Sequence, residues 1–389
     1  MNPIYLDYNA TTPVLPDVVD AMLPFLRDHY GNPSSSHALG LRTRAAIATA
    51  REQVAALIDC EPSEIVFTSG GTEANNLAIF GATEAIPGRR RLVTSTIEHP
   101  ATSRPCAWLG SRGHDLQILG VDQGGRVRTT DAQAVIDEST ALVAVMHSNN
   151  ETGVLQPIAE LSVLAHAAGA LVFTDAAQSI GKVPVSVRDL GVDLLSIAGH
   201  KLYAPKGVGA LYVRRGTPLA PFALGAGHER GLRPGTENVA YLVGLGVACE
   251  LVGRDLTRHA ERLRRLRDQL WTRLHTAIPG LALNGHAELR LPNTLNVRFP
   301  GVSGNAVLAG APELAASTGS ACHEGHESAS AVILAMGIDP QAAAGSIRLT
   351  LGRPTTDADV ERAADSLITS WRALSSPTVP VRQECEAAW

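Results

Sequence analysis

The chain has 389 residues, which exceeds the usual size of one domain and favours two closely packed domains. Hydrophobic residues make up 45% and charged residues 18%, as in ordinary globular proteins, and a net charge of −5 argues against a polyanionic partner such as nucleic acid. The N-terminus lacks a signal-peptide pattern and no apolar run is long enough for a membrane span, so we expect a cytoplasmic protein. Five scattered cysteines argue against a disulfide framework.

Helix-like stretches alternate with short apolar runs from about residue 43 to about residue 260. This pattern is typical of a mostly parallel sheet wrapped by helices, so we predict an α/β domain. A charge-rich amphipathic helix over 257–276 marks the change to a smaller C-terminal α/β unit, with a boundary near residue 256. The clearest strands are residues 64–69, 91–96, 141–148, 170–175, 194–199 and 209–213.

Polar clusters follow nearly every predicted strand, at the sheet edge where α/β proteins bind ligands. Gly71 and Thr72 open a helix whose free N–H groups suit a phosphate, although turn and capping chemistry accounts for them equally well. Asp175 ends a buried strand, and Gln178 follows three residues later. A buried carboxylate needs a cationic or protonated partner, such as the pyridine nitrogen of pyridoxal phosphate; the alternative role is a helix cap.

His200 and Lys201 follow another apolar strand, where a lysine is out of place for packing. Desolvation lowers a lysine pKa and favours the free amine that bonds to a carbonyl, whereas the alternative is an ordinary surface lysine. His99 and Asn150 occupy equivalent positions after two other strands. A lone histidine there is more often structural, but the coincidence of four such clusters favours one shared pocket.

Cys322 lies in a stretch of small and polar residues that we interpret as an accessible loop, which makes it a candidate nucleophile. His323, Glu324 and His326 beside it give a competing metal-site interpretation, which we favour less because zinc ligands usually come as two separated pairs. Arg348 stands inside an apolar strand, where it needs an anion. A bidentate clamp on a substrate carboxylate and a structural ion pair are equally consistent with that position.

Taken together, these segments resemble the cysteine desulfurase and selenocysteine lyase family of class V aminotransferases, over nearly the full chain and in the same order. The segments are YLDYNATTP, GNPSSSHALG, FTSGGTEANN, TIEHP, NNETGVLQPI, TDAAQSIGK, AGHKLYAPKG, RPGTEN, GSACHEG and SIRLTLGR. The resemblance implies the fold type I of pyridoxal-phosphate-dependent transferases. In that fold a large domain over 14–256 holds a mostly parallel seven-stranded sheet, and residues 1–13 and 257–389 form a small domain with the catalytic-cysteine loop.

The resemblance also implies a role for each matching residue. Lys201 carries the pyridoxal phosphate, His99 stacks on its ring and assists proton transfer, Asp175 binds its nitrogen, and Gln178 and Asn150 lie beside its phenolic oxygen. Gly71, Thr72 and His200 bind the phosphate, while Thr236 reaches the cofactor of the partner in a homodimer. Cys322 is the sulfur-accepting nucleophile, Arg348 binds the substrate carboxylate, and Asn150 also belongs to the substrate-binding residues. Ala198 departs from the family, because many desulfurases have a phosphate-binding serine there.

The implied activity is conversion of L-cysteine to L-alanine, with the sulfur taken up by Cys322 as a persulfide and passed to a protein acceptor. That sulfur would serve iron–sulfur assembly or nucleic-acid modification, without direct contact between this chain and nucleic acid. The first alternative is a selenocysteine lyase acting on L-selenocysteine. Less favoured are another class V aminotransferase and a non-catalytic sulfur-transfer scaffold, because the full set of site residues is present.

Overall fold

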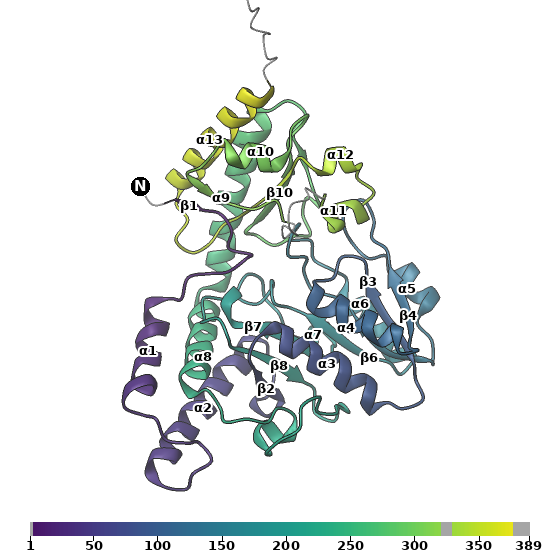
Figure 1. The fold of residues 1–389 in the computed structure, drawn as a ribbon, viewed down its shortest axis with the longest axis vertical. Coiled ribbons are helices and arrows are strands. Elements are labelled where there is room, and N and C mark those ends of the chain that lie inside the picture. The colour runs from purple at the N-terminus through teal and green to yellow at the C-terminus, as the bar shows by residue number, and fades with distance from the viewer. Residues whose placement is uncertain (1–2, 320–328, 376–389) are drawn as a thin grey trace, which may run out of the picture.

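The computed structural model describes residues 3–319 and 329–375 and confirms the predicted α/β fold (Figure 1). Its main sheet has seven strands, in the order β2-β8-β7-β6-β5-β3-β4. The bounds are β2 (Ile65–Thr68), β3 (Arg91–Ser95), β4 (Asp115–Leu119), β5 (Thr140–Ala144), β6 (Leu171–Asp175), β7 (Leu194–Ala198) and β8 (Gly209–Val213). All pairings are parallel except the two made by β8. All six strands predicted from the sequence are present in this sheet.

β4 is the strand that the sequence analysis missed. It lies at the edge of the sheet, pairs only with β3, and carries exposed or half-buried residues at four of its five positions. Because an edge strand with few buried side chains lacks a continuous apolar run, its sequence carries little strand signal.

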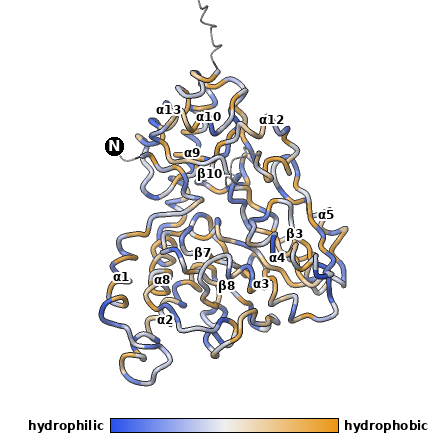
Figure 2. The backbone as a smooth tube through the Cα atoms, viewed as in Figure 1, coloured by the Kyte–Doolittle hydropathy of each residue, from blue (hydrophilic) through white to orange (hydrophobic). Residues whose placement is uncertain are grey.

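Alternate strand residues face two separate cores, as the two-residue period of a strand requires. Val66, Phe173 and Leu211 belong to the core beneath α3 (Gly71–Ala85) and α4 (Pro100–Ser111). The opposite face packs against α2 (Ala38–Leu57) and α8 (Val239–Arg254), among others. That core also includes residues of α1 (Pro16–Arg27), α5 (Thr129–Val135), α6 (Ile158–Ala167) and α7 (Val187–Leu190), and of α11 (Ala331–Ala335) and α12 (Pro340–Ala343) from the C-terminal part of the chain. Figure 2 shows hydrophobic and hydrophilic residues alternating along the surrounding helices.

A third core lies above the main sheet in Figure 1 and joins the N-terminal segment to the C-terminal part of the chain, so that these parts form a second, smaller unit. It contains an antiparallel sheet in the order β12-β10-β9 and a parallel pair, β1 with β11. These strands are β1 (Ile4–Tyr5), β9 (Ala282–Leu283), β10 (Thr294–Arg298), β11 (Leu314–Ala315) and β12 (Ser346–Thr350). The helices that contribute to this core are α9 (Leu256–Ala277), α10 (Gly304–Ala309) and α13 (Asp357–Ser375). The exact domain limits proposed from the sequence stay a prediction.

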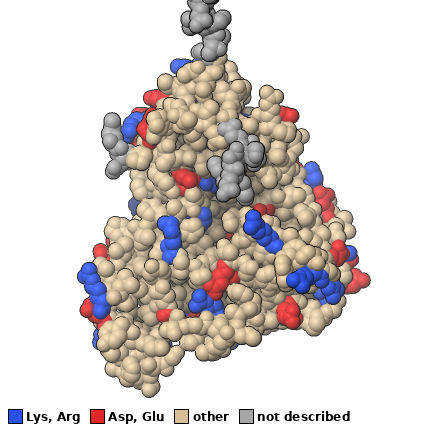
Figure 3. Space-filling model, in the orientation of Figure 1, with Lys and Arg blue, Asp and Glu red and all other residues tan. Residues whose placement is uncertain are grey.

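The helix predicted over 257–276 is α9, in which Leu263, Leu266 and Leu270 are buried while most charged residues are exposed or half-buried; Arg267 is the buried exception. Charges of both signs are dispersed over the face shown in Figure 3. Within the described residues, no helix combines the length and apolar character that a bilayer crossing requires.

Because Gly209 has no side chain, β8 can pack closely against the start of α3. A Cβ atom at Gly209 would lie 2.5 Å from the carbonyl oxygen of Ile197 and 2.7 Å from Cα of Gly70. Because both contacts are with backbone, we expect Gly209→Ala to lower the free energy of unfolding by about 1–3 kcal/mol in urea titrations. Gly120→Ala is the matched control, since no atom lies within 4 Å of its added Cβ. Equal stability of the two variants would contradict this packing.

Candidate active site

A cavity of about 480 Å³ lies where the carboxyl ends of the main-sheet strands meet the second unit. It brings together nine of the residues predicted from the sequence: Gly71, Thr72, His99, Asn150, Asp175, Gln178, His200, Lys201 and Arg348. The N-terminal segment contributes Asp7, Asn9 and Ala10 to the lining. The segment after β11 contributes Ser317 and Gly319. The predicted convergence of strand-end clusters in one pocket is therefore confirmed.

Lys201 is held in this cavity by carbonyl groups. It ends the short helical turn η2 (Gly199–Lys201) after β7, and its Nζ donates to the backbone oxygens of Asn9 and Ala10, each at 2.7 Å. Burial, and next the positive charge of Arg348, lower the pKa of Lys201 to about 8, while the charges of Asp175 and Asp7 oppose this shift. At neutral pH roughly a tenth of the molecules therefore carry Lys201 as an uncharged, nucleophilic amine, far more than for an ordinary lysine.

Asp175 is a buried carboxylate at the end of β6. Its Oδ2 accepts from Nδ2 of Asn75 at 2.8 Å, and its Oδ1 accepts from the N–H of Ala177 at 2.9 Å. Both donors are neutral, so the position suits a further, cationic partner in the cavity. Asn75, on α3, was missed by the sequence analysis; the available signal was a polar side chain that interrupts the apolar face of that helix.

His99 caps the N-terminus of α4 and presents a neutral ring to the cavity. Its Nδ1 accepts from the N–H of Ala101 at 3.1 Å, which assigns the ring proton to Nε2. Burial lowers its pKa, an effect that the negative charge of Asp175 opposes and the positive charge of Lys201 reinforces. A flat, uncharged ring in this position suits stacking on an aromatic ligand.

The N-terminus of α3 forms one wall of the cavity. Gly71 opens the helix, and its backbone approaches Ala198 so closely that an added Cβ would lie 3.2 Å from the Ala198 methyl group. The first N–H groups of a helix lack acceptors within it, so Gly71 and Thr72 suit an anion. Burial lowers the pKa of nearby His200 to about 4, and its Nδ1 lies 3.1 Å from Oγ1 of Thr11. His200 therefore acts here as a neutral hydrogen-bonding group.

Gln178 has an amide orientation fixed from both sides. Its Nε2 donates to the carbonyl of Asn9 at 2.9 Å, and its Oε1 accepts from Nζ of Lys182 at 2.8 Å. Burial, together with the charges of Lys201 and Arg348, lowers the pKa of Lys182 well below its usual range. With its oxygen held by Lys182, Gln178 turns its N–H donors toward Asn9 and the cavity. Lys182 was not identified from the sequence, although it ends the segment TDAAQSIGK, four residues after Gln178.

Arg348 combines an ion pair with unused hydrogen-bonding capacity. In β12 it is buried, and its Nη2 donates to Oδ1 of Asp7 at 2.7 Å while Nη1 donates to the carbonyl of Asn150 at 3.1 Å. Its Nε is buried and lacks a hydrogen-bond partner among the described residues. The structural ion pair that the sequence left open thus exists, between Arg348 and Asp7. The Nε of Arg348 is left as a hydrogen-bond donor for a ligand carboxylate.

Two predicted site residues are not placed in this cavity. Thr236 is exposed and is not among the lining residues, so its predicted contact with a partner's cofactor stays a prediction. Cys322 lies outside the described residues, as do His323, Glu324 and His326 of the competing metal interpretation. The described part of the chain contains no cluster of three or more metal-ligating side chains.

The three described cysteines have the properties of unreactive thiols. Cys60, Cys106 and Cys249 are free, and burial raises the pKa of each to about 12. Thiolates are the nucleophilic form, so these residues stay protonated and weakly reactive at neutral pH.

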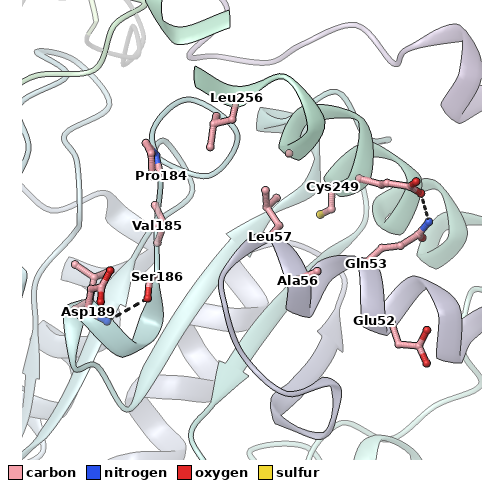
Figure 4. Close-up of a pocket in the computed structure, with 13 residues that line it drawn as sticks. Glu52, Gln53, Ala56, Leu57, Pro184, Val185, Ser186, Asp189, Cys249 and Leu256 are labelled. Atoms are coloured by element: carbon pink, nitrogen blue, oxygen red, sulfur yellow. Dashed lines mark hydrogen bonds between the residues drawn. The ribbon is translucent and has the colours of Figure 1, made fainter. Parts of the chain in front are cut away.

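A second cavity, of about 670 Å³, lies between α2, α8 and the segment before α7 (Figure 4). Its lining is mostly apolar, with the acidic residues Glu52, Asp189 and Glu250. Cys249 is its one cysteine, and that thiol has a raised pKa. Because this cavity lacks the lysine, histidine and arginine of the first, we assign the chemistry to the first.

The sequence and structure match known proteins over almost their full length. The aminotransferase class-V family model matches residues 4–363. A cysteine desulfurase of Gluconacetobacter diazotrophicus is 47% identical, over 94% of this chain and 92% of that protein. The chain belongs to the cysteine desulfurase family of class-V aminotransferases. Among solved structures, a NifS-like protein has a TM-score of 0.88 and 35% identity, covering 96% of this chain and 99% of that one. SspA in complex with cysteine has a TM-score of 0.80 and 35% identity, covering 89% and 98%.

Cysteine desulfurases depend on pyridoxal phosphate, and the cavity fits that group. A buried carboxylate with only neutral donors, Asp175, suits the pyridine nitrogen, and the desolvated amine of Lys201 suits the aldehyde. The start of α3 suits the phosphate. Ala198 lines the cavity without the hydroxyl that many desulfurases have at this position.

The lowered pKa of Lys201 predicts how the cofactor-free protein reacts with pyridoxal phosphate. The neutral amine is the reactive form, so the rate of covalent attachment should rise with pH and level off above a midpoint near 8. An ordinary lysine would give a midpoint near its usual value of about 10.4. Borohydride trapping followed by peptide mapping measures this rate at Lys201. A midpoint above pH 10 would contradict the desolvated environment.

Proposed function

We propose that this chain is a cysteine desulfurase that converts L-cysteine to L-alanine and transfers the sulfur to Cys322 as a persulfide. The observation that carries this proposal is one cavity lined by a desolvated lysine, a buried carboxylate and a buried arginine, namely Lys201, Asp175 and Arg348. The names of the relatives, cysteine desulfurases, and of the neighbour SspA in complex with cysteine support the substrate.

In the proposed reaction, the cofactor, when bound, supplies an electron sink for the electron pair left on the substrate Cα. Asp175 keeps the pyridine nitrogen cationic, and the Nζ of Lys201 takes the Cα proton. Arg348 binds the substrate carboxylate and so fixes the direction of the Cα–H bond relative to Lys201. His99 and Gln178 hold the ring and its phenolic oxygen.

Cys322 then takes the sulfur. Its thiolate attacks the substrate sulfur, the C–S bond breaks with its electrons going to the substrate carbon, and a proton completes alanine. Cysteine and a thiol thus give alanine and a persulfide, so no external oxidant or reductant is needed. Two observations support Cys322: the described cysteines have thiols of raised pKa, and Gly319, three residues earlier, lines the cavity.

Two substitutions separate the roles of Lys201 and Cys322. Lys201→Ala should abolish the protein-linked visible chromophore and all turnover, because no amine remains to bind the cofactor. Cys322→Ser should keep the chromophore but reduce sulfide release from cysteine under reductant by at least about a hundredfold, since the nucleophile is lost. Cys60→Ser is the matched control and should release sulfide like the parent protein. Full activity of Cys322→Ser on cysteine would overturn the assignment.

The assignment of the phosphate site also has a direct test. Ala198→Ser restores a hydroxyl at the position where Gly71 approaches most closely. A hydrogen bond to a charged group contributes about 1.5–3 kcal/mol, so we expect pyridoxal phosphate to bind roughly ten- to a hundredfold more tightly. Equilibrium dialysis of the cofactor measures this change. Weaker binding by a folded Ala198→Ser protein would place the phosphate elsewhere.

We further propose a homodimer in which Thr236 contacts the partner's cofactor, and delivery of the sulfur to a protein acceptor. The exposure of Thr236 away from its own cavity supports the first point. A cytoplasmic location agrees with the free state of the three described cysteines. The alternative activity, release of selenium from L-selenocysteine, predicts turnover of that substrate but none of cysteine.

A further inference from the structure

Asp7 is an acidic residue that lies in the active-site cavity and has no part in the proposed reaction. It follows β1, where the N-terminal segment passes between the two units. Its backbone forms a parallel β-bridge with Thr350, which lies two residues after Arg348 in β12. Its backbone is therefore fixed by the strand that carries the substrate-binding arginine.

The side chain of Asp7 neutralises Arg348 before any ligand arrives. The two side chains form an ion pair of 2.7 Å, with exposed fractions of 20% for Asp7 and 7% for Arg348. A buried arginine that is already paired attracts a carboxylate ligand much less than an unpaired arginine does. The reason is that the approaching anion meets an ion pair of zero net charge. Yet among the residues that the structure describes, Nε of Arg348 has no hydrogen-bond partner, so the guanidinium keeps a spare donor for a carboxylate.

Asp7 also acts on the place where the substrate amine must go. Its negative charge raises the pKa of Lys201 against the lowering effects of burial and of Arg348, so the field of Asp7 reaches the Lys201 amine. An α-amino acid that places its carboxylate at Arg348 and its amine near Lys201 therefore holds an ammonium group within the same field. That attraction offsets the repulsion between Asp7 and the ligand carboxylate.

We propose that Asp7 is a specificity-determining residue that makes the site select α-amino acids over carboxylates lacking an amine. A zwitterionic amino acid complements the pair, because its carboxylate faces Arg348 and its ammonium group is attracted by Asp7. A carboxylate without an amine is repelled by Asp7, and no attraction offsets that repulsion. This inference rests on the proposed function, in which Arg348 binds the substrate carboxylate.

The test compares two ligands that differ only in the amine: butyrate and L-2-aminobutyrate. Neither contains sulfur, so neither is turned over, and calorimetry on the cofactor-loaded protein gives both dissociation constants. Asp7→Asn removes the charge while keeping an oxygen acceptor for Arg348. We expect it to bind butyrate about tenfold more tightly, because one unit of repulsion at short range is lost. L-2-aminobutyrate should change less than about threefold, since loss of attraction offsets loss of repulsion.

The matched control is Asp20→Asn, which removes the same charge from an exposed position on α1. It should change neither dissociation constant. General damage to the site weakens binding, so tighter binding of butyrate cannot come from misfolding. If Asp7→Asn does not fold, Asp7→Ser takes its place with the same expected gain. Unchanged or weaker butyrate binding by a folded, cofactor-loaded variant would overturn the role of Asp7.

The outcome is separable from that of the proposed function. Failure of the parent protein to form alanine and sulfide from cysteine would contradict the desulfurase assignment, while the gain in butyrate binding would still establish the selectivity role. Normal desulfuration without that gain would leave the function intact and remove the role of Asp7.

Discussion

The desolvated amine of Lys201 is the constraint on which the rest of the site depends. A buried ammonium normally requires a carboxylate, but Nζ of Lys201 donates to two backbone carbonyls, those of Asn9 and Ala10. Carbonyl dipoles stabilise the charged form less than a full negative charge does, and the pKa of Lys201 falls to about 8. The nearby carboxylates serve other partners: Asp7 pairs with Arg348, and Asp175 accepts from neutral donors.

This arrangement exists only because the N-terminal segment joins both units at Asn9. The carbonyl of Asn9 accepts from Lys201 and Gln178 of the large unit. Its side chain donates to Oγ1 of Thr294 at 2.9 Å and accepts from Nδ2 of Asn293 at 3.1 Å, both in the small unit. The buried residue Asn9 therefore fixes the position of Lys201 relative to the β12-β10-β9 sheet, which carries Arg348. A shift between the units would alter the hydration, and so the pKa, of Lys201.

Much of this organisation could be predicted from the sequence, because strand periodicity places polar clusters at one edge of the sheet. Lys201, Asp175 and His99 were identified for that reason. The sequence could not show that Asn9 contacts Lys201, since the two are separated by 192 positions and the contact uses a backbone carbonyl. Asn75 and Lys182 were missed because their roles come from partners that local patterns do not reveal. The small and polar surroundings of Cys322 made it a candidate nucleophile, and the resemblance to a family gave it the sulfur-accepting role; it lies outside the described residues.

The central claim is that Lys201 and Cys322 cooperate in moving one sulfur atom from cysteine to the protein. The most direct measurement is a single turnover of the cofactor-loaded protein with L-cysteine in the absence of reductant, followed by quantification of alanine and mass spectrometry of the peptide containing Cys322. We predict one alanine for each peptide that gains the mass of one sulfur atom. Alanine without that gain, or the added sulfur on another cysteine, would contradict the account.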